Sequence, residues 1–366
     1  MSRMELELQT ESFVLDGPLA NGGPAMKMAA KRYRPGSPDS CEQGFTLLLT
    51  HGSGFHKELW EPALNALFRL QDRDPYSHMI REVWAFDWQA HGDSAILNAD
   101  ELKHREEAIT LADWAMAIVA FLKTPHVSGH RLIAIGHSAG SSTFMYTTKL
   151  LEPGVIPYLG IILVEPPLID KETFYAHLER QNKALRIARK ATSARRDVWP
   201  SKEDAFQWFS KRFPWNTWDV RVLQLFCSFG LRPASEDSAP GTVVTKCAKL
   251  EEAKTYDDVE HTFEATEQIE KICHDIPIHV VFGEILDLTY VSSLPTSSSY
   301  LTHALCPPHR PSYGQASAID KSKGRDVASV VRIPGAGHMI VQQKPEELAS
   351  VLMNILHGLR ARVSKL

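Results

Sequence analysis

Residues 136–140 constrain the fold of this chain more than any other segment, because they read Gly-His-Ser-Ala-Gly directly after the strand-like run Arg-Leu-Ile-Ala-Ile of residues 131–135. Such a run is typical of a buried strand, and residues 141–151 can follow it as a helix. A serine on a tight turn between a strand and a helix projects its hydroxyl away from both elements. The flanking glycines suit a place where neighbouring chains leave no room for a Cβ atom. Because the helix N-terminus favours developing negative charge, we predict that Ser138 is a nucleophile.

Further apolar runs predict a sheet around this turn. Strands are expected at four more places in the first half of the chain: 26–33, Phe45–Thr50, 82–87 and Tyr158–Val164. Segments 59–68 and Leu111–Leu122 lie between them and have the apolar spacing of helices. Strands separated by helices indicate βαβ units, so the predicted fold class is α/β with a mostly parallel central sheet flanked by helices.

The alternation of strands and helices stops after Pro167. The following segment has helical patterns and many charges, and its middle carries seven large aromatic side chains: Trp199, Phe206, Trp208, Phe209, Phe213, Trp215 and Trp218. A small helical core explains them in part, and we also expect a cap whose underside lines an apolar pocket. At 366 residues the chain is longer than one compact core usually holds. The predicted domains are a core of residues 1–167 and 276–366 and an inserted helical cap of residues 168–275.

The last part of the chain is expected to complete the sheet. Strands are predicted at 278–282 and Ser329–Ile333, and a final helix from Pro345 to about Leu356. Between the two strands, the Ser/Pro-rich stretch 292–325 predicts a long loop.

A serine hydroxyl needs a general base, and the base needs a carboxylate to orient it. His338 is the best candidate for the base, because it follows the last predicted strand in a glycine-rich turn. Glu165 and Asp287 both follow predicted strands and are expected near His338 at the carboxyl edge of the sheet. These residues alone leave the choice of acid open, and either carboxylate could instead cap a loop.

An oxyanion hole requires two backbone N–H groups aimed at the carbonyl oxygen that becomes charged. One is expected from Ala139, the residue after the nucleophile. The loop 51–55, which follows the strand Phe45–Thr50, is expected to supply the other, and Ser53 is the predicted donor. A flexible glycine turn would also explain the glycines of this loop, but it does not explain the preceding strand equally well.

The composition excludes several other functions. The formal net charge of −4 favours neither nucleic acid nor an anionic membrane surface as a partner. No run approaches the roughly 18 apolar residues of a spanning helix, so no stable membrane insertion is expected. Five scattered cysteines form no C-x-x-C pair, and no H-E-x-x-H or G-x-G-x-x-G motif occurs in a suitable context, so we predict neither a metal site nor a cofactor.

The last three residues, Ser364, Lys365 and Leu366, spell the tripeptide that directs proteins to peroxisomes. The N-terminal residues include no apolar stretch like that of a secretory signal. We therefore predict that the peroxisomal import receptor binds the C-terminus and that the protein is located in the peroxisome matrix.

These motifs resemble those of the α/β-hydrolase family over nearly the whole chain. Four of them stand in the family's order: His51-Gly52, Asp87-x-x-x-His91-Gly92-Asp93-Ser94, the Ser138 turn and Gly335-x-Gly337-His338. The resemblance implies an α/β-hydrolase fold with an inserted helical cap and a Ser–acid–His triad. The wider family places its acid near Asp287, although this residue stands one position further from Gly283 than the usual Gly-x-x-Asp pattern, and a long insertion separates it from His338.

A closer resemblance rests on the segment 50–62, which includes the run Gly54-Phe55-His56-Lys57-Glu58 and the tripeptide Trp60-Glu61-Pro62. It is similar to a fungal group of peroxisomal hydrolases that includes the acyl-CoA hydrolase of mycophenolic acid biosynthesis and hydrolases of host-selective toxin pathways. In the mycophenolic acid enzyme the acid follows the strand after the nucleophile helix. Carried over, this resemblance favours Glu165, with Asp287 as the alternative.

The resemblance implies a serine hydrolase that cleaves an ester or thioester of a hydrophobic acyl substrate. The peroxisomal address favours an acyl-CoA, and the fungal group suggests secondary-metabolite or toxin biosynthesis. A peroxisomal lipase or carboxylesterase is the first alternative. The second is a ligand-binding scaffold without catalysis, since a fold alone does not prove activity. Epoxide hydrolases and dehalogenases of this fold are disfavoured, because they have an aspartate where this chain has Ser138.

Overall fold

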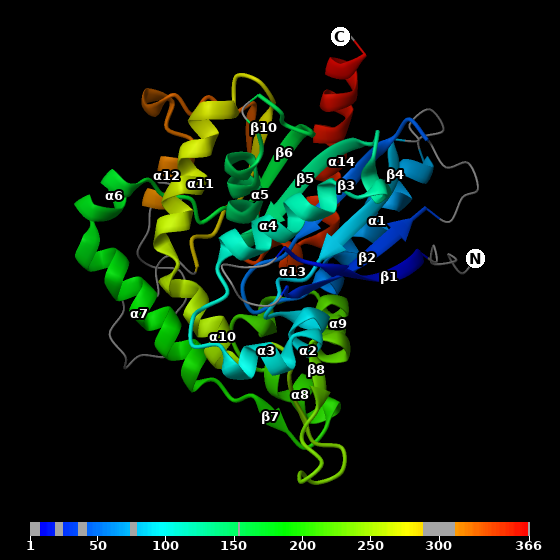
Figure 1. Cartoon of the computed structure of the whole chain (residues 1–366), viewed down its shortest axis with the longest axis vertical. Coiled ribbons are helices and arrows are strands. Elements are labelled where there is room, and N and C mark those ends of the chain that lie inside the picture. The colour runs from blue at the N-terminus through cyan, green and yellow to red at the C-terminus, as the bar shows by residue number, and fades with distance from the viewer. Residues whose placement is uncertain are drawn as a thin grey trace.

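The computed structural model describes residues 8–18, 25–35, 42–73, 79–152, 154–287 and 312–364. Its centre is an eight-stranded sheet with the strand order β1-β2-β4-β3-β5-β6-β10-β11 (Figure 1). The strands are β1 (Gln9–Asp16), β2 (Lys27–Arg34), β3 (Phe45–Thr50), β4 (Ile80–Phe86), β5 (Arg131–His137), β6 (Tyr158–Val164), β10 (Ile278–Gly283) and β11 (Ser329–Ile333).

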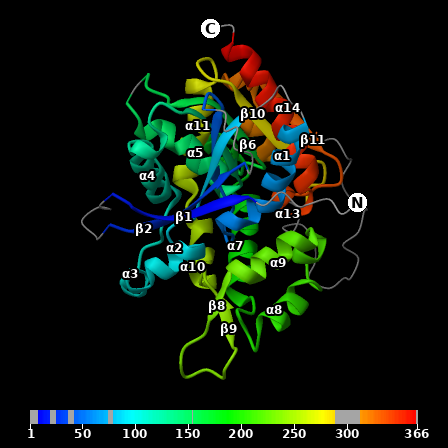
Figure 2. The ribbon, with the colours of Figure 1, turned by 90° about the vertical axis from the view of Figure 1, so that its right-hand side faces the viewer.

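The sheet is mostly parallel, which confirms the prediction. From β4 to β11 every neighbouring pair is parallel, whereas β1 pairs antiparallel with β2, and β2 antiparallel with β4. The structure adds β1, which the sequence did not predict. Its run Gln-Thr-Glu-Ser is exposed, so it lacks the apolar signal of the buried strands. The antiparallel pair β1–β2 crosses one side of the molecule in Figure 2.

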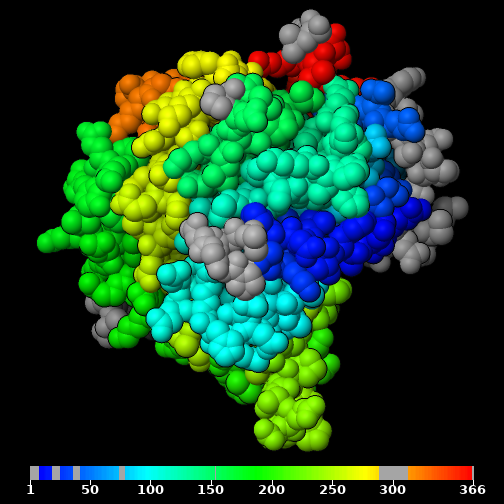
Figure 3. Space-filling view, in the orientation of Figure 1, coloured from blue at the N-terminus to red at the C-terminus, as the bar shows by residue number. Residues whose placement is uncertain are grey.

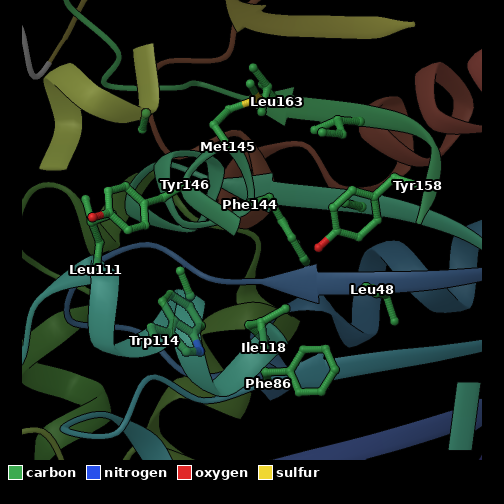
Figure 4. Close-up of a cluster of buried hydrophobic side chains, with 14 of the residues drawn as sticks. Leu48, Phe86, Leu111, Trp114, Ile118, Phe144, Met145, Tyr146, Tyr158 and Leu163 are labelled. Carbon is green, nitrogen blue, oxygen red and sulfur yellow. The ribbon is translucent and has the colours of Figure 1, made fainter. Parts of the chain in front are cut away.

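Two layers of helices cover the sheet. One face packs against α4 (Leu111–Leu122) and α5 (Ala139–Leu150), and the other against α1 (Glu61–Arg73) and α14 (Pro345–Val363). Successive residues of β3 alternate between the faces: Leu48 packs in the first core, Leu47 and Leu49 in the second. Figure 4 shows the first core, where Trp114 and Phe144 extend from the helices toward the strands.

The structure has further short helices around these layers. They are α2 (Gly92–Leu97), α3 (Ala99–His104), α12 (Tyr313–Ala318) and α13 (Ile340–Gln343), and the 3-10 helices η1 (Lys57–Trp60), η2 (Pro125–Val127) and η6 (Lys321–Lys323). Residues 312–323 were expected in a long loop, and here that prediction is wrong, because α12 and η6 form there; residues 292–311 lie outside the described residues. The final helix also extends past the predicted end near Leu356, to Val363.

Residues 168–258, between β6 and α11 (Val259–Ile272), form what we call the insertion. Its helices are α6 (Lys171–Ala176), α7 (Leu178–Ala194), α8 (Lys202–Phe209), α9 (Val220–Phe229) and α10 (Lys249–Lys254), with η3 (Trp215–Thr217) and η4 (Thr255–Asp257). The sequence did not predict its small antiparallel sheet of β7 (Val198–Trp199), β9 (Val243–Thr245) and β8 (Leu231–Pro233), whose strands have only two or three residues. The connection between β8 and β9 projects from the lower end of the molecule (Figure 3).

The aromatic side chains of the insertion pack mainly on one another. Trp199, Phe209, Trp218 and Phe226 share one cluster, which also includes Phe55 from the loop after β3. They therefore build a small core and contact the predicted oxyanion loop. By contrast α11, which lies within the predicted cap 168–275, packs against α5 in the first core of the sheet. The division into core and cap stays a prediction, and α11 belongs with the layer over the sheet.

The described helices include none with the length and apolar character needed to cross a bilayer. The C-terminal helix α14 ends at the upper edge of the molecule (Figure 1). Of the predicted targeting tripeptide, Ser364 follows this helix, whereas Lys365 and Leu366 lie outside the described residues.

Candidate active site

Ser138 occupies the turn between β5 and α5 with a backbone φ of 52° and ψ of −122°. Positive φ is uncommon for a residue with a side chain, and such strain is concentrated at functional sites. The close packing of the turn explains both glycines. A Cβ on Gly136 would lie 2.5 Å from the carbonyl carbon of Gly140, and one on Gly140 would lie 2.5 Å from Thr50 Oγ1. The local sequence therefore forms the sharp turn that exposes a serine hydroxyl.

His338 lies between the serine and a carboxylate. It follows β11 in the turn that precedes α13, and its Nε2 is 2.9 Å from Ser138 Oγ. On the other side of the ring, Nδ1 is 3.1 Å from Glu165 Oε2. An ionised carboxylate can only accept, so Nδ1 carries the proton and Nε2 is free to accept from the serine hydroxyl. The three side chains form a hydrogen-bonded chain from hydroxyl to carboxylate.

Glu165 is held rigidly at the end of β6. Its backbone φ is 48°, and its N–H donates to the carbonyl of Val281 at 2.8 Å. Oε1 accepts from the backbone N–H of Gly283 at 2.6 Å and from Gln315 Nε2 at 3.3 Å, which leaves Oε2 for the imidazole. The residue is 6% exposed. These contacts hold the carboxylate beside the imidazole of His338.

Asp287, the alternative acid, contacts the same histidine at a different atom. Its Oδ1 accepts the backbone N–H of His338 at 2.9 Å. Its carboxylate also lies so close to Gly337 that a Cβ on this glycine would come 2.0 Å from Oδ2. The structure therefore brings both predicted carboxylates to His338, with Glu165 at the imidazole and Asp287 at the main chain.

Two imidazoles lie side by side here with opposite pKa changes. Burial by itself lowers the pKa of His338, but the hydrogen bond and charge of Glu165, with the charge of Asp287, outweigh it and raise the pKa above the ordinary value. Burial lowers the pKa of His137 to about 3, so this ring stays neutral. His137 Nε2 donates to the backbone carbonyl of His338 at 3.0 Å and thereby supports the turn that carries the base.

Of the two predicted oxyanion donors, Ala139 follows the nucleophile directly, and Ser53 belongs to a loop that passes close to it. Ala139 begins α5, and the first N–H groups of a helix have no partner within it. The loop after β3, residues 51–55, passes so close to the serine that a Cβ on Gly52 would lie 3.2 Å from Ser138 Cβ. Ser53 is the next residue of this loop. Its role and that of Ala139 stay predictions, as do the catalytic roles of the three residues of the hydrogen-bonded chain.

The sequence did not single out two residues that support this site, His137 and Gln315. His137 was visible as the first variable residue of the Gly-His-Ser-Ala-Gly motif, but nothing in the pattern showed that its ring would reach the His338 turn. Gln315 lies in α12, within the stretch expected to be a loop, so no sequence signal connected it with Glu165.

Known proteins resemble the chain in sequence and in structure. The sequence profile of the Alpha/beta hydrolase family matches residues 47–351. Two curated proteins of Penicillium brevicompactum, the type I acyl-CoA thioesterases mpaH and mpaH′, are each 28% identical to the chain over 206 residues, which are 52% of this chain and 41% of either relative. The match thus spans less than half of the length of these relatives.

Solved structures show the same fold. The peroxisomal alpha-beta-hydrolase Lpx1 of Saccharomyces cerevisiae superposes with a TM-score of 0.69 at 16% identity, covering 98% of this chain and 90% of that one. An esterase of M. tuberculosis superposes with a TM-score of 0.60 at 14% identity, covering 96% of this chain and 92% of that one. The thioesterase domain of the curacin biosynthetic pathway has a TM-score of 0.58 at 15% identity, covering 95% of this chain and 99% of that one. At identities this low, the similarity to these structures shows a shared fold alone.

Proposed function

The chain belongs to the alpha/beta hydrolase family, and from this we propose that it is a serine hydrolase that cleaves an ester or thioester of a hydrophobic acyl group. One observation carries the proposal. Ser138, His338 and Glu165 form a continuous hydrogen-bonded chain, with 2.9 Å between hydroxyl and imidazole and 3.1 Å between imidazole and carboxylate. This is the arrangement that activates a serine for acyl transfer.

In the first half of the reaction, Ser138 Oγ attacks the carbonyl carbon of the substrate while His338 Nε2 takes the hydroxyl proton. The carbonyl oxygen becomes an oxyanion, which the N–H groups of Ala139 and Ser53 stabilise. Glu165 holds the imidazole in its tautomer and stabilises the imidazolium. The tetrahedral intermediate then collapses, the C–O or C–S bond breaks, and His338 returns the proton to the departing alcohol or thiol.

In the second half, water hydrolyses the acyl-enzyme. His338 takes a proton from the water as its oxygen attacks the acyl carbon, and the same N–H groups stabilise the second oxyanion. When this intermediate collapses, the bond from the acyl carbon to Ser138 Oγ breaks and His338 protonates the serine. The acid leaves and the enzyme is restored.

The surroundings of the serine favour an apolar acyl group. Phe55, in the loop beside Ser138, lies edge-on to Trp218 of the insertion, with ring centroids 5.4 Å apart, and parallel to His137 with centroids 6.2 Å apart. This connects the nucleophile turn to the aromatic cluster of the insertion. The predicted cap, with an apolar pocket beneath it, is part of the proposal.

Among apolar substrates we favour an acyl-CoA. The two curated relatives are named as acyl-CoA thioesterases, and the chain ends in Ser-Lys-Leu, the peroxisomal tripeptide. We propose the peroxisome matrix as its location, the import receptor as its partner and fungal secondary metabolism as its context. Removing residues 364–366 from a tagged protein should leave it in the cytosol; continued import into peroxisomes would remove that part of the proposal.

The function is tested by screening purified protein against acyl-CoAs of different chain length and p-nitrophenyl esters, with products read by mass spectrometry. Ser138→Ala should abolish hydrolysis, and Ser350→Ala, on the exposed side of α14, serves as the matched control. Turnover of neutral esters without acyl-CoAs would favour a lipase or carboxylesterase. Binding of acyl-CoA without turnover would favour a scaffold that only binds ligand.

A further inference from the structure

The insertion contacts the predicted oxyanion loop directly. Thr255, the first residue of η4, lies with its Oγ1 3.2 Å from Ser53 Oγ, and the two hydroxyl groups are hydrogen-bonded. Thr255 Oγ1 donates its one hydrogen to the carbonyl of Glu252, at 2.7 Å, so the Ser53 hydroxyl donates to Thr255 Oγ1. The side chain of Ser53 is thus tied to the insertion, while its backbone N–H belongs to the loop beside the nucleophile.

The next residue of the loop, Gly54, lies close to the insertion on the same side. Gly54 has a backbone φ of +80°, and a Cβ on it would lie 2.6 Å from the carboxyl carbon of Glu252. The carboxylate itself is fixed, because Arg195 donates to Oε1 at 2.9 Å and to Oε2 at 2.6 Å. Both partners of this ion pair are largely buried. A glycine is required here, since any side chain would displace this paired carboxylate.

A second anchor holds the end of the loop. Lys57, which is 2% exposed, donates from Nζ to Asp87 at 2.8 Å and to Asp93 at 2.7 Å. Asp93 also accepts from Lys246 of the insertion, at 2.5 Å. Asp87 in turn accepts the backbone N–H of Lys57 at 2.8 Å. Ion pairs of Lys57 with Asp87 and Asp93 therefore hold the chain directly after Phe55, while Ser53 is hydrogen-bonded to the insertion and Gly54 lies against it.

We propose that Thr255 and Glu252 are positioning residues for the oxyanion hole. This inference rests on the proposed function, in which the Ser53 N–H stabilises the oxyanion. Such a donor must lie about 2.7–3.1 Å from the oxyanion. The Ser53 peptides are flanked by Gly52 and Gly54, and glycine allows many backbone conformations. The contacts from the insertion restrict this freedom, so they set the direction of the Ser53 N–H.

The test is a double-mutant cycle of Ser53→Ala and Thr255→Val, with p-nitrophenyl butyrate as the substrate. Both changes remove a hydroxyl and keep every backbone N–H. Loss of an entire oxyanion donor costs about 100- to 1000-fold in kcat, so a misdirected donor should cost about 10-fold. KM should change less than about 2-fold, because the contact acts in the transition state. Both halves of the reaction form an oxyanion, so kcat falls whichever is slower.

The two hydroxyls act through one contact, so the double variant should also lose only about 10-fold. Thr255→Ser keeps the hydroxyl and should restore most of kcat. Thr262→Val is the matched control. Thr262 lies on α11, and its hydroxyl donates to the carbonyl of Asp258 one turn earlier, as the Thr255 hydroxyl does to that of Glu252. The thermal unfolding temperature of each variant is also measured. A variant that loses kcat but unfolds at the wild-type temperature shows a positioning effect and not a loss of folded protein. Glu252→Gln loses one of the two hydrogen bonds with Arg195 that fix this side chain beside Gly54, so it should also lower kcat more than it changes KM.

Two outcomes would overturn the positioning role: single variants within 2-fold of the wild type, or a double variant whose loss equals the product of the single losses. Failure of the proposed function looks different. In that case Ser138→Ala retains turnover, or the wild-type protein hydrolyses no ester or acyl-CoA, whatever the Thr255 variants do.

Discussion

Glu165 Oε2 lies 3.1 Å from Nδ1 of His338, the contact on which its proposed role as the acid of the triad rests. The other oxygen of this carboxylate accepts from the Gly283 N–H and from Gln315, so the group cannot turn away from the imidazole without losing both bonds. Asp287 instead accepts the His338 backbone N–H. This division of roles between two carboxylates underlies the first two predictions.

Glu165→Gln should reduce kcat by about 1000- to 10000-fold, because an amide does not hold the base in its required tautomer. KM should change little. Asp287→Asn should have a much smaller effect on kcat, since the amide oxygen can still accept the His338 N–H. Steady-state kinetics of both variants on one substrate decide whether Glu165 or Asp287 is the acid. The assignment is wrong if Asp287→Asn abolishes turnover while Glu165→Gln does not.

When kcat/KM is plotted against pH, the midpoint of its fall toward acid pH should lie above the ordinary pKa of histidine. His338 acts as a base only when unprotonated, so kcat/KM falls as the pH drops below its pKa in the free enzyme. Its pKa is raised above 6.5, so the midpoint should also lie above 6.5. Asp287→Asn removes one of the charges that raise the pKa, so its midpoint should move to lower pH. An unchanged midpoint would show that Asp287 does not act on the imidazole.

Gly140→Ala should destabilise the fold by about 1–3 kcal/mol or more, because the added methyl would lie 2.5 Å from Thr50 Oγ1 and 2.8 Å from the carbonyl of His51. Gly358→Ala is the matched control. It lies within α14 with no atom inside 4 Å of the added Cβ, so it should stabilise by about 0.5–1 kcal/mol. Urea unfolding measures both. Equal stability of the two variants would contradict the account of the nucleophile turn.

Much of the fold could be predicted because the buried strands carry a strong signal. The segments Phe45–Thr50 and Tyr158–Val164 are continuous apolar runs, and the structure has strands with the same bounds. No comparable apolar run marks β1, whose exposed residues are largely polar. The two- and three-residue strands of the insertion are too short to show a period of two.

The sequence could indicate that Ser138, His338, Glu165 and Asp287 lie near one another, but not which atom of His338 each carboxylate contacts. Ser138 and His338 stand in motifs whose glycines are required by close packing, so their neighbourhood follows from local sequence. Both Glu165 and Asp287 follow strands whose ends meet at His338. Which atom each contacts depends on displacements of a few ångströms in the tertiary structure, which no spacing rule specifies. The contacts of Thr255 and Glu252 with the oxyanion loop have the same origin.

Active-site labelling tests the central claim most directly. Wild-type protein, Ser138→Ala and Ser350→Ala are each treated with an alkyl fluorophosphonate, which modifies activated serines, and their peptides are sequenced by mass spectrometry. The account predicts one modified residue, Ser138, in the wild type and in Ser350→Ala, with loss of hydrolysis in proportion to labelling. Modification of a different residue, or full hydrolytic activity after Ser138 is modified, would contradict it.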